Sequence, residues 1–281
     1  MAETVATYKV RQTFRYDYAE PIRDLKHRLI VIPPEQFGDQ RRTYHDVLVE
    51  LDEVRVSDRR DRFGNHVVEV FAPQVQSAIE FVAEVTVERR ASVPNVLEGG
   101  WPPAGHLLEP TRLTEADRRI AAEAAVLSEN VGWGLALADR INDWVYASLT
   151  YRHGVTGVKT TAAEALALGA GVCQDYAHLM LAMCRACRLP ARYVSGHMVG
   201  MGGTHAWVEV VLPDERGSGS PGNAVAHAFD PTHAARPGLG YVTIAAGRDY
   251  ADVAPTSGTY RAGGGSGKLT TTKQVTLTGT E

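Results

Sequence analysis

The sequence contains no apolar run long enough to cross a membrane. A membrane-spanning helix needs about 20 consecutive apolar residues, and no segment of this 281-residue chain approaches that length. The N-terminus, Met1-Ala2-Glu3-Thr4, also lacks the basic start and apolar stretch of a signal peptide. We therefore expect no membrane partner and a cytoplasmic location.

Cysteine and net charge are scarce as well. Three cysteines are too few for a disulfide scaffold and suit a reducing compartment. The 29 basic and 33 acidic residues leave a net charge of -4, which gives no electrostatic case for a nucleic-acid partner. With 44% hydrophobic and 22% charged residues, the chain can bury a core as one large or two ordinary domains. The oligomeric state stays open.

The N-terminal part has the pattern of β-strands. Residues 5–18, 46–54 and 79–87 alternate between apolar and polar side chains, as half-buried strands do. Gly64-Asn65 is a turn signal inside a fourth strand-like region, residues 61–71. This spacing predicts a small antiparallel β-sandwich over about residues 1–90.

The pattern changes to helix after a Pro- and Gly-rich linker over residues 91–110. Helices are predicted from a Thr114 cap to about residue 127, over 134–149, over 162–168 behind a Thr160-Thr161 cap, and over 172–187. Strands are predicted over residues 191–199, 205–212 and 224–229, with a polar loop over 213–223. Residues 263–267 read as a flexible link before a last strand, 274–277.

We therefore expect an α+β fold in three segments: an N-terminal β domain (1–95), a core that includes the linker (96–262), and a C-terminal link and strand (263–281). Gly263 to Lys268 superficially resembles a phosphate loop. The segment fails the motif because Leu269 stands where a magnesium-binding Ser or Thr is required. No cofactor is expected.

Cys173 is the first candidate site residue. It follows Gly171 at the predicted start of a helix, where free backbone N–H groups and the helix dipole favour a thiolate. The same N–H groups can bind an oxyanion, and the glycine would allow a substrate backbone to approach closely. The alternative is a buried structural cysteine, which is the common fate of a free thiol.

His205 and Asp230 complete a set of residue types suited to thiol-based acyl transfer. In that chemistry the thiol attacks a carbonyl, the imidazole moves a proton, and the carboxylate fixes the imidazole. Strand alternation places His205, Trp207 and Glu209 on one face of their strand. Asp230 ends an apolar strand before Pro231. The alternatives are a core or surface histidine and an ordinary Asp-Pro turn.

The remaining candidates favour packing. Cys184 and Cys187 form a C-x-x-C, but late in a helix, so packing is favoured over redox chemistry. No further ligands with zinc spacing accompany them, and no metal is expected. His178 is interpreted as a packing residue. Asp175 is expected either to favour the helix dipole or to shape a cleft.

Several segments together resemble the transglutaminase-like superfamily, in its bacterial branch with an N-terminal β region. The segments are Gly171-Val172-Cys173-Gln174-Asp175-Tyr176, Leu189-Pro190-Ala191-Arg192, Thr204-His205-Ala206-Trp207, Phe229-Asp230-Pro231-Thr232, Gly247-Arg248-Asp249-Tyr250, and Asp61-Arg62-Phe63-Gly64-Asn65. The chain departs from the family at Ala226, where many relatives have Trp, and at His233, where Asn is frequent.

The resemblance implies a papain-like core of helices packed on an antiparallel sheet, with a Cys173–His205–Asp230 catalytic triad acting through a thioester. The expected partner is a peptide or protein substrate. Hydrolysis, as a protease or amidase, is favoured because an amine acceptor must outcompete water. A protein cross-linking transglutaminase, a non-catalytic peptide-binding module, and a redox protein using Cys184 and Cys187 remain as alternatives.

Overall fold

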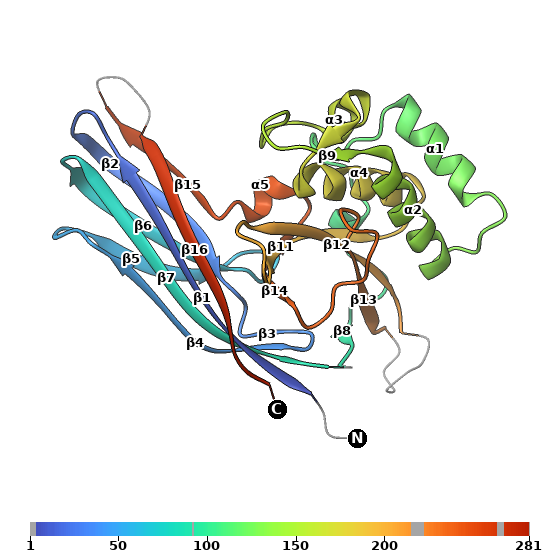
Figure 1. Cartoon of the computed structure of the whole chain (residues 1–281), viewed down its shortest axis with the longest axis horizontal. Helices are drawn as coiled ribbons and strands as arrows, with labels where there is room; N and C mark the ends of the chain where they lie inside the picture. Colours follow the sequence, from blue (N-terminus) through green and yellow to red (C-terminus); the bar gives the residue numbers. More distant parts are fainter. Residues whose placement is uncertain (1–3, 92, 215–221, 263–266, 281) are drawn as a thin grey trace.

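A β-sandwich forms one half of the molecule (Figure 1). The computed structural model describes residues 4–91, 93–214, 222–262 and 267–280. One sheet has the order β16-β1-β7-β4-β3 and the other β15-β2-β6-β5. The strands are β1 (Val5–Asp17), β2 (Ile22–Ile32), β3 (Gln36–Phe37), β4 (Gln40–Val49), β5 (Arg55–Arg60), β6 (His66–Val75), β7 (Ala78–Arg90), β15 (Thr256–Arg261) and β16 (Lys268–Thr280).

Alternating side chains build the inner face of this sandwich. In β1, Tyr8, Val10 and Phe14 are buried while the intervening residues face outward, as the pleat of a half-buried strand requires. In β2, Leu29 to Ile32 are all buried, so the C-terminal end of this strand is in the core on both faces. The sandwich predicted from residues 1–90 is present, and β2 is a strand that the sequence pattern missed.

Two C-terminal strands complete the sandwich. β16 runs antiparallel along β1 from Ala6–Thr280 to Asp17–Lys268, and β15 pairs with β2. The division of the chain in space therefore differs from the predicted segments, because residues 256–261 and 268–280 belong to the N-terminal sheets. The predicted strand over 274–277 is part of the longer β16. Most of the predicted flexible link, residues 263–266, lies outside the described residues.

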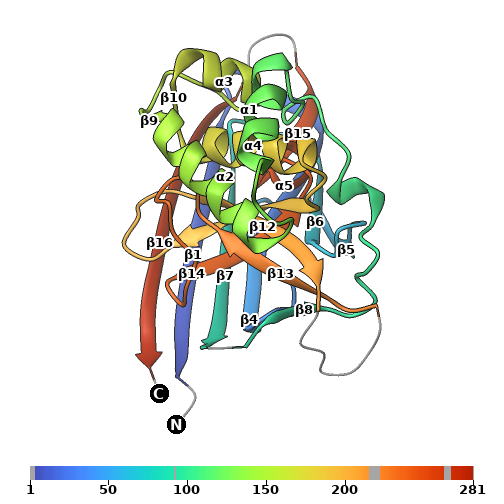
Figure 2. The same ribbon diagram turned by 90° about the vertical axis from the view of Figure 1, so that its right-hand side faces the viewer.

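The second half of the molecule is a core built from both helices and a β-sheet. Its sheet has the order β14-β11-β12-β13-β8, and the helices gather on one side of it (Figure 1 and Figure 2). Its elements are β8 (Asn95–Leu97), a 3-10 turn (Gly105–Leu107), α1 (Arg118–Ser128), α2 (Leu135–Ser148), β9 (Thr150–Tyr151), α3 (Ala162–Leu168), β10 (Ala170–Gly171), α4 (Cys173–Ala186), β11 (Ala191–Met198), β12 (His205–Pro213), β13 (Ala224–Phe229), β14 (Tyr241–Gly247) and α5 (Tyr250–Val253). Part of the predicted polar loop, residues 215–221, is outside the described residues.

Helix α4 is the centre of the core. Every residue from Gln174 to Arg185 is buried, because α1, α2 and α3 surround the helix on one side and β11 and β12 close the other. A helix that is buried all round needs small and apolar residues on every face, and Ala177, Leu181 and Ala182 supply them. Within the described ranges, no helix combines the length and apolar character that crossing a bilayer requires.

The predicted helix caps are confirmed at Thr161 and wrong at Thr114. Thr161 forms a reciprocal capping box with Glu164 at the start of α3, and Gly169 ends that helix in the left-handed conformation. Helix α1 starts later than predicted, because Asp117 accepts from the Ile120 amide at 2.8 Å. Thr114 is instead buried and accepts a hydrogen bond from Arg185 of α4.

Two buried amide side chains fasten the sandwich to the core. Strand β14 is the edge of the core sheet, so its outer backbone groups need partners. Gln40 bonds to both backbone groups of Thr243 at 2.8 and 2.9 Å, and Asn65 does the same at Ala246 at 2.8 and 2.9 Å. Asp61 accepts from the Asn65 side chain at 3.0 Å and thereby orients it. The Asp61-to-Asn65 motif is therefore part of the junction between the two halves.

Candidate active site

Cys173 is the first residue of helix α4, as predicted. The N-terminal end of a helix leaves its first backbone N–H groups without intrahelical partners. Asp175 satisfies the amide of Val172 at 2.7 Å and also accepts from the Thr156 hydroxyl at 2.7 Å. Asp175 therefore caps the start of the helix, a role that was not among the two expected for it. The Cys173 thiol is half-buried, and its sulfur lies 3.9 Å from the Thr204 carbonyl oxygen.

Gly171 is explained by Asp175 rather than by substrate approach. A Cβ atom added at Gly171 would lie 2.5 Å from Asp175 Oδ2 and 2.7 Å from its Cβ. Any side chain there would displace the carboxylate that caps the helix, which would disturb the backbone that holds Cys173. The structure thus corrects the interpretation of this glycine and ties it to the geometry of the helix start.

His205 and Asp230 meet as the strand pattern suggested. His205 begins β12 and Asp230 follows β13, and these two strands pair antiparallel. His205 Nε2 lies 2.7 Å from Asp230 Oδ2, with both side chains buried. The second ring nitrogen of His205 is then left for Cys173, whose thiol hydrogen-bonds to the imidazole. The structure brings the three predicted residues together from α4, β12 and the end of β13.

The Asp230 carboxylate also receives three further hydrogen bonds. His233 Nδ1 and the Tyr241 hydroxyl each donate to Oδ2 at 2.8 Å, and the Thr232 amide donates to Oδ1 at 2.9 Å. Sequence analysis noted His233 only as a departure from the family. Tyr241 carried no signal, because a single aromatic residue in a strand that the sequence pattern missed is indistinguishable from a packing residue.

This network sets the charges of the site. Burial by itself would lower the pKa of His205, but hydrogen bonds and charge interactions with Asp230 and Cys173 outweigh it and raise the pKa to about 9. Burial by itself would raise the pKa of Asp230, but its contacts with His205, His233 and Tyr241 lower it to about 2. At neutral pH the arrangement therefore favours an imidazolium held between a carboxylate and the thiol.

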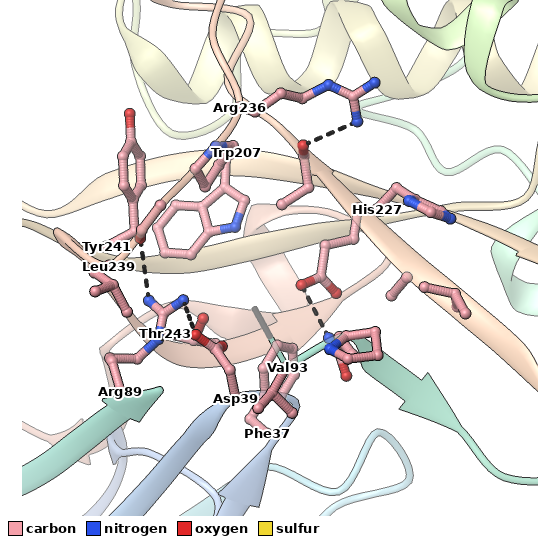
Figure 3. Close-up of a pocket in the computed structure, with 18 of the residues that line it drawn as sticks. Phe37, Asp39, Arg89, Val93, Trp207, His227, Arg236, Leu239, Tyr241 and Thr243 are labelled. Carbon is pink, nitrogen blue, oxygen red and sulfur yellow. Dashed lines mark hydrogen bonds and ion pairs between the residues drawn. The ribbon is translucent and has the colours of Figure 1, made fainter. Parts of the chain in front are cut away.

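The aromatic rings of Trp207 and Tyr241 lie close to the His205 ring. The ring centroids of Trp207 and Tyr241 lie 6.2 and 5.9 Å from that of His205. Both residues also line a cavity of about 490 Å³ between the core sheet and the sandwich. Figure 3 shows Trp207 and Tyr241 above this cavity and the Asp39–Arg89 ion pair below them. The side chains of His205 and Asp230 are only 4% and 0% exposed, and burial of this kind strengthens the hydrogen bond between them.

Among the described residues, two groups of side chains have a spacing that could hold a metal ion. One is His205, Asp230 and His233. A histidine binds a metal ion as the neutral imidazole. The raised pKa of His205 favours its cationic form instead, and its 2.7 Å contact with Asp230 is a hydrogen bond. The other is His45, Asp58 and His66 in the sandwich, where the Arg42 guanidinium, 3.5 Å from His66 Nδ1, opposes a cation.

The other sequence candidates are placed away from this centre. Cys184 is fully buried and Cys187 half-buried at the end of α4, with both thiols free. Burial raises the pKa of both thiols, which opposes redox chemistry and supports packing. His178 is buried and accepts from the Tyr250 amide at 3.2 Å, so this packing residue also anchors α5.

Two family models match the chain. The model of the transglutaminase-like superfamily matches residues 124–217, which include Cys173 and His205. The model of the bacterial transglutaminase-like N-terminal region matches residues 8–88, which form most of the sandwich. Asp230 lies beyond both matches, so its assignment depends on the geometry described above.

Individual relatives cover most of the chain. An uncharacterized protein of Mycobacterium tuberculosis H37Rv is 29% identical over 281 residues, 89% of this chain and 86% of its own. An uncharacterized protein of Mycobacterium leprae is 33% identical over 180 residues, 60% of each chain. A crystal structure of a putative cysteine protease from Cytophaga hutchinsonii has a TM-score of 0.78 and 22% identity, covering 99% of this chain and 92% of that one. This last likeness shows the same fold.

Proposed function

Since the chain belongs to the transglutaminase-like superfamily, we propose that it is a cysteine-dependent acyl-transfer enzyme acting on peptide or side-chain amides. Cys173 is the nucleophile, His205 the proton carrier, and Asp230 the residue that orients His205. The observation that carries this proposal is the chain of contacts from the Cys173 thiol through the imidazole to a carboxylate 2.7 Å away.

The reaction proceeds in two stages. The Cys173 thiolate attacks the amide carbonyl, and His205 donates its proton to the departing nitrogen as the C–N bond breaks, which leaves a thioester and a free amine. His205 then takes a proton from the acceptor, whose oxygen or nitrogen attacks the thioester. With water as acceptor, the products are a carboxylic acid and the restored thiol.

The start of α4 supports the tetrahedral intermediates of both stages. The first N–H groups of the helix point toward its N-terminal end, where the carbonyl oxygen of a bound acyl group becomes negative. The Oδ2 atom of Asp175 is occupied by the Val172 amide and the Thr156 hydroxyl. A preformed donor set of this kind lowers the barrier without reorganisation during the reaction.

We favour water as the acyl acceptor, which would make the protein a protease or amidase. Transfer to an amine needs an acceptor site and a thioester shielded from water. The rings of Trp207 and Tyr241 shield the imidazole, but the acidic groups around the neighbouring cavity already pair with arginines. Asp39 bonds to Arg89 at 2.7 Å and Glu209 to Arg192 at 2.6 Å. They therefore do not present a free anion to attract a cationic amine.

The test is product analysis with labelled water. The protein is incubated with a mixed peptide library in H₂¹⁸O, with and without a primary alkylamine, and products are identified by mass spectrometry. We expect carboxyl products that carry ¹⁸O, lost in Cys173→Ala and kept in Cys187→Ala, a matched half-buried cysteine. Amide-linked alkylamine as the main product would establish the cross-linking alternative. A wild-type cellular effect that persists in Cys173→Ala would favour the peptide-binding module.

A further inference from the structure

Lys273 reaches from the C-terminal strand into the junction beside the candidate site. It lies opposite Gln12 in the β1–β16 pair, in the row whose side chains face inward. Its neighbours Thr272 and Gln274 are exposed, whereas Lys273 is half-buried. Its ammonium group lies 3.0 Å from His197 Nδ1 of β11. A side chain from the sandwich therefore contacts the core sheet next to the candidate active site.

The register of the core sheet places the backbone of His197 beside that of the proposed base, with the two side chains on opposite faces of the sheet. His197 follows Gly196, and Gly196 pairs directly with His205 across the β11–β12 ladder. Burial lowers the pKa of Lys273 to about 8, and its charge interaction with the nearby Cys173 acts in the opposite direction. Cys173 and Lys273, which are a hundred positions apart in the sequence, are thus electrostatic neighbours.

The Lys273 ammonium has more hydrogen-bond donors than its contact with His197 uses. It carries three N–H groups, and His197 Nδ1 accepts one of them. Burial holds the pKa of His197 well below its ordinary value, so this partner is neutral. In the part of the chain that the structure describes, no carboxylate is paired with Lys273.

We propose that Lys273 is a specificity-determining residue that binds a carboxylate of the acyl donor close to the scissile carbonyl. This inference rests on the proposed function of Cys173. A half-buried cation without a carboxylate partner is costly, and a carboxylate supplied by the substrate completes the pair. The donors that the site favours are then amides with a free carboxylate near the reacting carbonyl. Neutral analogues react more slowly.

Two alkylating reagents test this without a known substrate. Iodoacetate and iodoacetamide have nearly the same shape and differ by one negative charge, and in both the thiolate displaces iodide. The rates at Cys173 are measured by peptide mapping, and their ratio, iodoacetate over iodoacetamide, is compared between variants. The ratio cancels any change in the amount of thiolate, because the same sulfur attacks both reagents. A purely structural role of Lys273, with no effect of its charge at Cys173, would therefore leave the ratio unchanged.

We expect the ratio to fall about tenfold in Lys273→Met, which is the fold-change of one charge-assisted hydrogen bond. Lys273→Arg, which keeps the charge, should retain most of the wild-type ratio. Lys268→Met is the matched control, since Lys268 is an exposed lysine on the same strand. An unchanged ratio in Lys273→Met, or an equal fall in Lys268→Met, overturns the proposal.

The same experiment separates this proposal from the proposed function. If wild-type Cys173 does not react with iodoacetamide faster than the thiol of the unfolded chain, the nucleophile itself is not activated and the proposed function fails. If it does, and the ratio is insensitive to Lys273, only the carboxylate-binding role fails. Should Lys273→Met not fold, Lys273→Gln takes its place, because it keeps a polar side chain of similar length without the charge, and its ratio is compared with that of Lys273→Arg.

Discussion

Replacement of Asp230 by asparagine should remove most of the stability that the protein gains from protonation of His205. The pKa of His205 rises from 6.5 to about 9 through its contacts with Asp230 and Cys173, although burial opposes the rise. At 1.36 kcal/mol per pKa unit, this corresponds to about 3 kcal/mol of preference for the imidazolium. Because Cys173 shares in that preference, we expect Asp230→Asn to lower the free energy of unfolding by about 2 kcal/mol near pH 5.5.

The pH dependence gives this prediction its sign. The raised pKa of His205 adds stability that is complete below pH 6.5 and is lost as the pH rises through about 9. The lowered pKa of Asp230 adds stability that is complete above pH 3.8 and is lost as the pH falls toward about 2. The difference between wild type and Asp230→Asn should therefore be largest between these limits and should shrink above about pH 9.

Urea denaturation across this pH range measures the difference. Asp143→Asn, at an exposed carboxylate on α2, is the matched control and should change the stability by less than about 0.5 kcal/mol. A stability loss in Asp230→Asn that is the same at pH 5.5 and pH 10 would show that the residue acts through packing alone. That result would refute the assigned charge state of the pair.

Three further outcomes are expected. Asn65→Ala removes two buried hydrogen bonds to β14 and should destabilise the protein by about 2–4 kcal/mol in urea titrations, against almost nothing for the exposed Gln76→Ala. Tyr241→Phe removes one donor to Asp230 and should lower kcat up to about tenfold with KM unchanged, as steady-state kinetics on a cleaved peptide would show; a change in KM alone would contradict its positioning role. Replacing Cys184 and Cys187 by serine should leave the alkylation rate of Cys173 unchanged, because both lie at the opposite end of α4 from Cys173. Loss of that reactivity in a folded double variant would revive the redox alternative.

Much of the candidate site could be predicted because its residues lie at the ends of regular elements. Cys173 follows a glycine at a helix start, His205 begins an apolar strand, and Asp230 ends one. Each of these positions has a local signature in the sequence. Strand pairing then brings the elements together, since β12 and β13 are antiparallel neighbours.

Residues that act across the fold could not be predicted in the same way. Tyr241 and Lys273 belong to strands whose pattern is weak or whose partner is far away in the sequence, and nothing local distinguishes them from packing or surface residues. Gln40 is a similar case, since its role depends on the edge of β14 some 203 positions later. The periodicity of apolar residues in a sequence indicates which face of a helix or strand is buried. It does not indicate which distant strand that element pairs with.

The domain division was missed for the same physical reason. β16 alternates and was recognised in part as a strand, but its partner β1 is at the opposite end of the chain. β2 was missed because its first half carries charged residues, while Leu29 to Ile32 are buried on both faces and do not alternate. The cytoplasmic location and the peptide or protein partner stay predictions.

The central claim, an activated Cys173 thiolate held by His205, is tested most directly by the rate of iodoacetamide alkylation against pH, with peptide mapping, in wild type and His205→Ala. The account predicts that Cys173 is labelled fastest of the three cysteines and already near pH 6, and that this low-pH reactivity disappears in His205→Ala. Labelling of Cys173 only near pH 8.5, as for a free thiol, or identical profiles in the two proteins, would contradict it.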